Sequence, residues 1–367
     1  MNIGDAGVVR SHYGSPFAEE RRLRSGDAFT LLARDVIRVS GADRGKLLHL
    51  ISSQNFEDLA VGDSSEMLVL DAQGHVVHGS DVVVAEDAIW LITEQGRGAA
   101  LIEHLKRMTF MMRVETVAVD SMAFGLMVTA AQLPDAFTHI ATVVWQDPWP
   151  TTAPGGAHYG VKDADHPAFN SRRCVVVVPR GETEHAIETL LNAGLSAAGT
   201  QAWEAARVMD WRPSLSGEGS YSTLPNEVDW LRTAVHTEKG CYPGQETVAK
   251  LINLGKPPRR LTFLYLEGDE ELPEPGTPVT VGGKPAGIVT SVARSVDDGP
   301  VALALLKRSV PLDVVVEVGD FVASQVAVVS REGKSSVSPS ERPGAGLSAR
   351  RLASSPSAVE NKSVKGR

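Results

Sequence analysis

The segment best suited to chemistry is the loop at residues 239–246, which contains Cys241, one of only two cysteines in the chain. Two glycines and a proline within eight residues specify a tight backbone path, which would hold the thiol out of the core. Lys239 adds a positive charge nearby, and the helix expected to follow directs its positive N-terminal end toward the loop. Both effects favour thiolate over thiol, so we expect Cys241 to be exposed and reactive.

A structural turn with a cysteine small enough to fit is the alternative interpretation of this loop. The nearby cation, the helix start and Tyr242, whose ring could lie against a flat ligand, together favour a functional loop. No second cysteine lies nearby, so there is no local resolving partner and no complete metal site, although His236 lies five residues upstream. Cys174 begins an apolar run and is expected to be a buried strand residue.

The length and the cysteine content limit the number of domains and the cellular compartment of the protein. At 367 residues the chain can form about two or three compact units. Two distant cysteines exclude a disulfide framework and indicate a reducing compartment. The N-terminus is polar and charged, and no apolar run approaches the roughly 18 residues of a membrane-spanning helix. We therefore expect a cytoplasmic protein without a membrane segment.

The charge is unevenly distributed along the chain. The formal net charge is -9, but residues 331–367 carry eight Lys and Arg against three Asp and Glu, which leaves the rest near -14. Proteins that bind nucleic acid through its phosphates usually carry the opposite sign on the folded surface. We expect no direct nucleic-acid binding, and nothing in the sequence marks an obligate dimer surface, so a monomer is expected.

The elements that position the loop follow an α+β pattern with largely antiparallel pairing. Expected strands lie at 36–40, 67–70, 76–84, 88–92, 114–119, 124–128 and 174–178. One expected helix starts at Asp43, and the others lie at 99–108, 183–192, 200–211 and 247–254. In the first of these helices, Leu47, Leu48, Leu50 and Ile51 should form the buried side. The stretch 145–170 is rich in Pro, Gly, Thr and His and predicts an irregular exposed connection.

The composition and the hydrophobic pattern of the sequence change near residue 259. Short strands punctuated by Gly and Pro, at 261–266, 279–281, 286–292, 301–306 and 314–316, predict a separate small β-barrel. From about residue 331 the sequence is Ser, Pro, Gly, Lys and Arg, which predicts disorder. We therefore divide the chain into an α+β region (1–258), a β-barrel (259–330) and a disordered tail (331–367).

The loop sequence Lys-Gly-Cys-Tyr-Pro-Gly-Gln-Glu resembles the K-G-C-Y-x-G-Q-E signature of the YgfZ family, folate-binding relatives of the glycine cleavage T-protein. The likeness covers about residues 7–329. It includes Arg207, Pro213, Pro225 and Glu227 before the loop and residues 254–260 after it. The resemblance implies a three-lobed arrangement with ferredoxin-like antiparallel sheets and a C-terminal β-barrel. It also implies a tetrahydrofolate-type ligand and a role in assembling or maintaining iron-sulfur proteins, which supports tRNA modification indirectly.

Several residues could serve such a folate. A carboxylate can engage the guanidine-like edge of a pterin, and an aromatic ring can lie against its flat face, so Glu227, Tyr242 and Glu218 are candidates. Cations could receive the anionic glutamyl tail; the candidates are Lys239, Lys250, Lys256, Arg259 and Arg260. Arg207, also a candidate for cofactor binding, can equally be an internal ion-pair partner. Glu227 can equally be a solvated acid after Pro225.

An aminomethyltransferase of the T-protein type is the second functional hypothesis. That chemistry needs a carboxylate near the reacting folate nitrogen, but the matching place in this chain holds His78 and Gly79, with Asp81 displaced. His75 and His78 point to opposite faces of a strand, which argues against a metal site. We favour a folate-binding accessory factor with iron-sulfur client proteins as partners and Cys241 as its thiolate. A folate-binding module without thiol chemistry is the third hypothesis.

Overall fold

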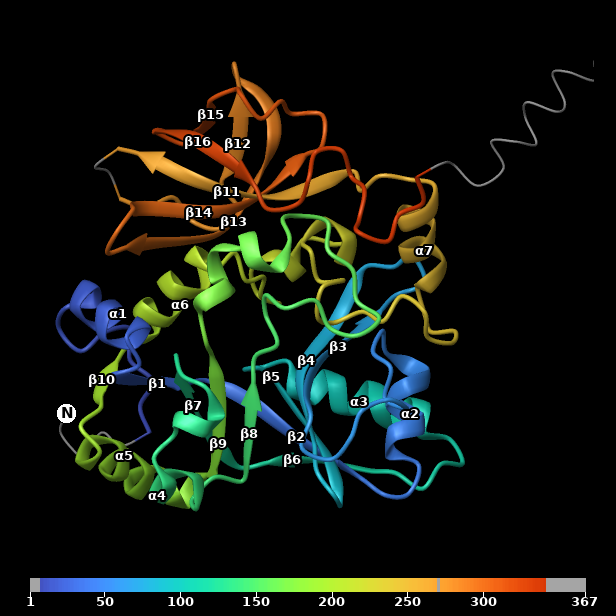
Figure 1. Cartoon of the computed structure of the whole chain (residues 1–367), viewed down its shortest axis with the longest axis vertical. Coiled ribbons are helices and arrows are strands. Elements are labelled where there is room, and N and C mark those ends of the chain that lie inside the picture. Colours follow the sequence, from blue (N-terminus) through green and yellow to red (C-terminus); the bar gives the residue numbers. More distant parts are fainter. Residues whose placement is uncertain (1–6, 269–270, 341–367) are drawn as a thin grey trace, which may run out of the picture.

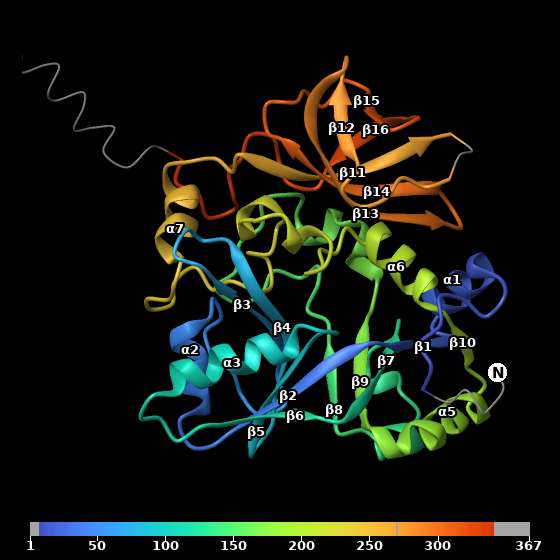
Figure 2. The ribbon, with the colours of Figure 1, turned by 180° about the vertical axis from the view of Figure 1, so that it is seen from behind.

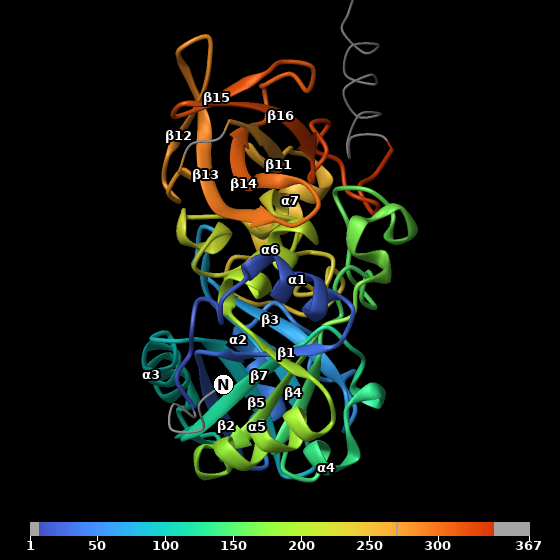
Figure 3. The ribbon, with the colours of Figure 1, turned by 90° about the vertical axis from the view of Figure 1, so that its left-hand side faces the viewer.

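The computed structural model describes residues 7–268 and 271–340, and these form three bodies (Figures 1 and 3). Two five-stranded sheets lie side by side, and a closed six-stranded barrel sits above them in the views of Figures 1 and 2. This is the α+β pattern that the sequence predicted, in the three-lobed arrangement that the resemblance implied. None of the described helices is long and apolar enough to cross a membrane.

The first sheet has the strand order β10-β1-β7-β9-β8. Its strands are β1 (Ala28–Leu32), β7 (Ser121–Leu126), β8 (Val143–Gln146), β9 (Cys174–Pro179) and β10 (Ser196–Ala198), and only the pair β1–β10 is parallel. Strand β9 is buried on both faces, because Val175 and Val177 lie in one core cluster while Cys174 and Val176 lie in another. This explains its continuous apolar run. Burial raises the pKa of Cys174 to about 12, as expected for a core residue.

Helices cover the first sheet on its outer side. The second core cluster combines β9 with α4 (Asp135–Thr138) and α5 (Thr183–Asn192), through residues such as Phe137 and Ile187. Helix α1 (Pro16–Arg24) packs against α6 (Thr200–Met209) near the boundary with the barrel. The expected helix at 200–211 therefore ends two residues early, and Trp211 adopts a positive φ of 52°.

The second sheet is entirely antiparallel, with the order β3-β4-β5-β2-β6. Its strands are β2 (Arg34–Ser40), β3 (Ser64–Leu70), β4 (Val76–Val84), β5 (Ala88–Glu94) and β6 (Glu115–Val119). Helices α2 (Arg44–Ile51) and α3 (Gly98–Thr109) pack on one face through Leu47, Leu48, Leu101 and Leu105. Leu50 is 44% exposed, so its expected place on the buried side of α2 is wrong.

The barrel closes in the order β11-β14-β13-β12-β15-β16. Its strands are β11 (Arg259–Glu267), β12 (Pro278–Val281), β13 (Lys284–Ser295), β14 (Gly299–Lys307), β15 (Val316–Val318) and β16 (Phe321–Ala327). The sequence did not predict β16, and it placed β15 two residues early. The barrel shares a core with the α+β region, because Leu261 and Phe263 pack in one cluster with Trp230 and Tyr242.

Two expected loop regions differ from the structure. Residues 145–170 are largely irregular, but Trp149, Tyr159 and His166 are buried, so this connection is not an exposed one. Residues 331–340, assigned to a disordered tail, instead fold back on the body: the amide of Ser336 donates to the carbonyl of His158 (2.8 Å). The rest of the predicted tail, 341–367, lies outside the described residues.

Candidate functional site

The Cys241 loop is held against the turn between β3 and β4. Gly244 precedes α7 (Gln245–Asn253) with a left-handed φ of 78°. A Cβ atom there would lie 2.6 Å from the carbonyl oxygen of Asp71 and 2.9 Å from Cα of Gly74, so only glycine fits. The loop therefore leaves the core as the sequence predicted, and Cys241 is exposed.

Lys239 has a structural role in this loop. Its Nζ donates to the carbonyl oxygens of His49, Ser52 (2.7 Å) and Gln54 (3.0 Å), at the C-terminal end of α2. Burial lowers the pKa of Lys239 to about 8, and the negative charge of Glu57 partly opposes that shift. Since all three donors are used, Lys239 is not free to receive a ligand or pair with the thiolate.

Tyr242 is also part of the scaffold. Its ring is buried, lies 5.1 Å from Nζ of Lys239 and belongs to the core cluster that joins the loop to the barrel. Burial raises the pKa of Tyr242. The expectation that this ring offers a face to a flat ligand is therefore wrong, because protein atoms already cover it.

Glu227 is buried and fully paired. Its carboxylate accepts from Nε (2.9 Å) and Nη2 (2.7 Å) of Arg259, and from the amides of Leu224 (3.0 Å) and Arg259 (3.1 Å). This ion pair fastens the start of β11 to the α+β region. Neither Glu227 as a pterin ligand nor Arg259 as a receptor of the glutamyl tail fits this arrangement.

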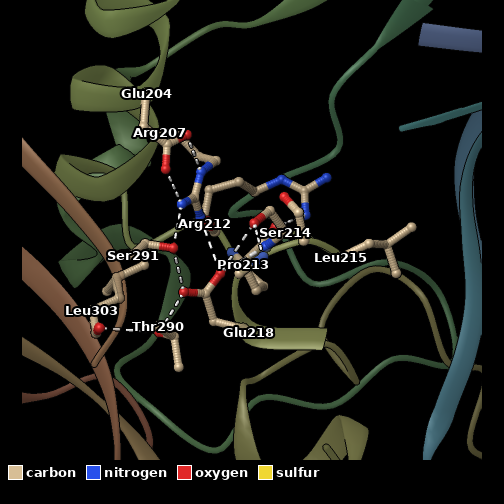
Figure 4. A network of polar contacts seen from close by, with 12 residues as sticks. Glu204, Arg207, Arg212, Pro213, Ser214, Leu215, Glu218, Thr290, Ser291 and Leu303 are labelled. Carbon is tan, nitrogen blue, oxygen red and sulfur yellow. Dashed lines mark hydrogen bonds and ion pairs between the residues drawn. The ribbon is translucent and has the colours of Figure 1, made fainter. Parts of the chain in front are cut away.

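Arg207 and Glu218 meet in a buried network that joins α6 to the barrel (Figure 4). Nη1 of Arg207 donates to Glu218 (3.1 Å), while Glu204 accepts from Nε (2.8 Å) and Nη2 (2.5 Å). Glu218 also accepts from the hydroxyls of Thr290 (2.7 Å) and Ser291 (2.8 Å) on β13. Burial lowers the pKa of Arg207, but the charges of Glu204 and Glu218 outweigh it and raise the pKa. The alternative of an internal ion pair is thus correct.

A small cavity of about 90 Å³, which we call the central chamber, lies beside this network. The second sheet forms one wall, because the register places Glu66 opposite Asp81 and Asp81 opposite Ile92, with Arg34 opposite Glu94. These side chains share one face of the sheet. On the other side lie Trp145, Trp203, Arg173, Arg207 and Arg212.

Most charges around the central chamber are paired. Arg212 binds Glu66 (2.6 Å) and Asp147 (3.1 Å), and Arg173 binds Asp210 (3.1 Å). Arg34 donates only to the neighbouring carbonyl of Ala33 (3.0 Å) and has no carboxylate partner among the described residues.

Asp81 is the acidic counterpart of Arg34 in the chamber. It has no hydrogen-bond or ion-pair partner in the described part of the chain. Burial and, secondly, the charge of Glu66 raise the pKa of Asp81 to about 8.

A cavity of about 830 Å³, which we call the α6 cavity, adjoins the chamber. The two share Arg34, Glu94, Trp203, Arg207 and Ser214 as lining residues. The α6 cavity is also lined by Phe17 of α1, a residue that is 43% exposed, and by Glu204. An aromatic ring, carboxylates and an arginine around a cavity of this size suit a flat, drug-sized polar ligand.

A third cavity, of about 800 Å³, lies between residues 146–154 and the segment Gln54–Ser65. Cys241 lines none of these three cavities, so the thiol and the cavities are separate places on the molecule. The sequence predicted no site role for Phe17, Arg34, Trp203 and Glu204, and marked Asp81 only as a displaced acid. No local motif marks them, because they come from separate elements, namely α1, β2, β4 and α6.

Comparison with known proteins agrees with this architecture. Residues 259–332 match the family described as CAF17, C-terminal beta-barrel domain. An Arabidopsis thaliana protein named "putative transferase, chloroplastic" is 26% identical over 265 residues, which cover 70% of this chain and 59% of that protein. The match therefore spans less than two thirds of the relative's length.

The structure resembles the aminomethyltransferase T of the glycine cleavage system from Bartonella henselae. The TM-score is 0.67 and the identity 16%, over 89% of this chain and 94% of that protein. At this identity the likeness concerns the fold. The fold thus resembles that of aminomethyltransferase T, and the barrel matches the CAF17 C-terminal barrel model, which agrees with the expected resemblance to the YgfZ family.

Proposed function

We propose that this protein binds a reduced folate in the α6 cavity and acts in the cytoplasm as an accessory factor for iron-sulfur proteins. The observation that carries the folate proposal is the α6 cavity itself, with Phe17 and Trp203 on its wall beside Glu94 and Glu204. The fold it shares with aminomethyltransferase T and the CAF17-type barrel give further support, because both agree with the resemblance to the folate-binding YgfZ family.

The residues of the α6 cavity suit the parts of a reduced folate. The exposed ring of Phe17 can lie against the pterin, and Glu204 can accept from its guanidine-like edge. Although Arg207 occupies Glu204, a carboxylate has about four acceptor positions and retains room for a ligand. The cavity volume of about 830 Å³ falls within the range of roughly 300–1,000 Å³ usual for such ligands.

Cys241 would act on a different molecule from the folate. The thiol is exposed and lines neither the α6 cavity nor the central chamber, so it can meet a client protein without the ligand. In a strain that lacks this protein, we expect Cys241→Ala to fail to restore an iron-sulfur enzyme while Cys174→Ala restores it. Full activity of Cys241→Ala would favour the folate-binding module without thiol chemistry.

Calorimetric titration with tetrahydrofolate tests the folate proposal. We expect saturable binding that weakens about tenfold in Phe17→Ala, because stacking on one ring is worth about 1 kcal/mol or more. Phe169→Ala is the matched control, since Phe169 is 44% exposed and lies outside the α6 cavity. Absence of binding to the folded protein, or equal loss in both variants, would contradict the proposal.

Aminomethyl transfer remains a second candidate because of Asp81. The sequence has no acid at the position that matches the catalytic carboxylate of the T-protein. In the structure, however, Asp81 lines the central chamber next to the α6 cavity. The test is a one-carbon transfer assay with tetrahydrofolate and an aminomethyl donor. Turnover that Asp81→Asn abolishes would favour the transferase, whereas folate binding without turnover would favour the accessory factor.

A further inference from the structure

The fully buried Arg260 of β11 differs from the other buried arginines. Five arginines in the described part of the chain are at most 6% exposed. Four of them form an ion pair with an aspartate or glutamate, namely Arg173, Arg207, Arg212 and Arg232. Arg260 forms no ion pair with any described residue, so its positive charge is buried without a counter-charge.

All hydrogen bonds of Arg260 go to neutral groups. Nη1 donates to the hydroxyl of Thr262 (2.6 Å), and Nη2 donates to the side-chain oxygen of Gln325 (2.8 Å) and to the carbonyl of Val310 (3.3 Å). Nε has no partner among the described residues, although the residue is 0% exposed. A buried charge is unfavourable unless an opposite charge or a full set of hydrogen bonds compensates it. The end of the barrel at Arg260 therefore favours a bound anion.

A second arginine, Arg308, lies beside Arg260. The amide of Arg308 donates to the carbonyl of Pro258 (3.0 Å), which continues the pairing of β11 with β14 by one residue. Arg260 is opposite Leu306 in this pairing, so Arg308 is its diagonal neighbour on the same face, with about 7–8 Å between their backbone positions. The Arg308 side chain has no hydrogen-bond or ion-pair partner in the described residues, and its Nε is buried. Arg308 thus adds a second uncompensated charge at the same end of the barrel.

A third arginine, Arg331, reaches the same place from the segment after the barrel. Its Nη2 donates to the carbonyl of Ser309 (3.3 Å), the residue between Arg308 and Val310. Burial and, secondly, the charge of Arg331 lower the pKa of Arg260 to about 10, so the two guanidinium groups are close enough to repel each other. No acid in the described residues pairs with any of the three arginines.

The three arginines suit a phosphate group. A planar guanidinium donates in a fork that matches the oxygens of phosphate, and three positive charges favour a doubly charged anion over a singly charged one. Arg331 is exposed and Arg308 is half-buried, so these two side chains can contact the anion. Arg260 has no exposed surface and therefore attracts the anion by its charge from below.

We propose that Arg260, Arg308 and Arg331 form a binding site for a phosphate group, either free phosphate or the phosphate of a small ester, at the end of the barrel. This site goes beyond the proposed function. None of the three arginines lines the α6 cavity, so the site is separate from the proposed folate site. The sequence predicted Arg260 as a receptor of the glutamyl tail, which its place outside the α6 cavity does not support.

Calorimetric titration of the full chain with inorganic phosphate tests the proposal. At pH 8, where a phosphate group is mostly doubly ionised, we expect saturable binding, with acetate bound about tenfold more weakly or less. Arg308→Met and Arg331→Met should each weaken phosphate binding about tenfold, because each removes a charged donor. Arg107→Met and Arg180→Met are the controls and should bind as the wild type does, since both arginines are exposed and pair with acids elsewhere on the molecule.

Glycerol phosphate in place of inorganic phosphate distinguishes the two sources of the anion. Tighter binding of glycerol phosphate supports a phosphate ester as the ligand, because the ester then makes contacts of its own. Equal or weaker binding supports free phosphate. In both cases Arg308→Met should weaken the binding.

Three results would overturn the proposal. Absence of phosphate binding to the folded protein at roughly 100 mM would exclude the site at any useful affinity. A heat that chloride at equal ionic strength reproduces would show only screening of the surface charge. Phosphate binding that both Arg308→Met and Arg331→Met leave unchanged would place the anion elsewhere. Because folate is absent from every titration, these outcomes are independent of the tetrahydrofolate test.

Discussion

The buried network of Arg207 and Glu218 and the central chamber lie side by side, yet their ionisable groups are in opposite states. In the network every charge is paired, and Glu218 alone accepts five hydrogen bonds, from Arg207, Thr290, Ser291 and both the amide and the hydroxyl of Ser214. In the chamber Arg34 and Asp81 have no charged partner among the described residues. The network satisfies its own charges and so stabilises the fold, whereas Arg34 and Asp81 are partly exposed and are left to solvent or a ligand.

The residues in and near the Cys241 loop that the sequence predicted as ligand contacts are structural instead. Glu227, Lys239 and Tyr242 stood out in the sequence as ligand contacts, but each is buried and committed to protein atoms. Recognisable residues around the Cys241 loop thus hold the loop and the barrel in place. The open binding groups come from positions without a motif, such as Arg34 and Phe17.

The largest expected effect is on the closed network. Glu218→Ala should lower the free energy of unfolding by roughly 3–5 kcal/mol, because it leaves Arg207 buried beside fewer acceptors. Denaturant unfolding measures this loss. A change below about 1 kcal/mol would show that the network contributes little to stability. The paired charges of the network would then not differ in stability from the unpaired charges of the chamber.

Asp81→Asn should act in the opposite direction. Burial raises the pKa of Asp81 from its usual 3.8 to about 8 in the folded protein, so the wild type loses stability as the pH rises from about 4 to 8. The variant removes this loss, and we expect it to be more stable than the wild type by on the order of 2 kcal/mol at pH 8.

Thermal unfolding across this pH range measures the Asp81 effect. The two proteins should have similar stability at pH 4 and diverge as the pH rises. Equal stability at both ends of the range would mean that the carboxyl group is ionised and solvated. Asp87→Asn, at an exposed ion pair with Arg38, is the control.

A smaller effect is expected for the segment that follows the barrel. Truncation after Val329 removes Ser330, whose amide donates to Tyr159 (3.0 Å), and Ser336, whose amide donates to His158. Losing such hydrogen bonds should cost about 1–2 kcal/mol in unfolding free energy. Truncation after Ser340 is the control, and equal stability of both truncated proteins would show that residues 330–340 contribute nothing.

The smallest effect on stability is expected for Cys241→Ala. The side chain is exposed, so the free energy of unfolding should change by less than about 0.5 kcal/mol. Tetrahydrofolate affinity should also be unchanged, because Cys241 lies outside the α6 cavity. A stability loss above 1 kcal/mol or so would support the structural interpretation of the loop instead.

The sequence by itself determined the elements and the exposure of the thiol. Apolar periodicity located most strands and helices, and the run Cys174–Val178 correctly indicated a strand buried on both faces. The glycine pattern of the loop at 239–246 predicted a backbone path away from the core, which the left-handed Gly244 confirms. These are local properties, since backbone conformation and side-chain periodicity depend on near neighbours in the chain.

Only the tertiary structure decided which charged residues are paired within the protein and which are not. Glu227 is paired because Arg259, 32 positions later, enters the barrel beside it. Asp81 has no partner because strand pairing places it opposite Glu66, in a chamber where Arg207 and Arg212 bind other acids. Pairing of this kind depends on contacts between segments that are distant in the sequence. The residues next to a carboxylate in the chain are therefore the same whether it binds a guanidinium of the protein or a ligand.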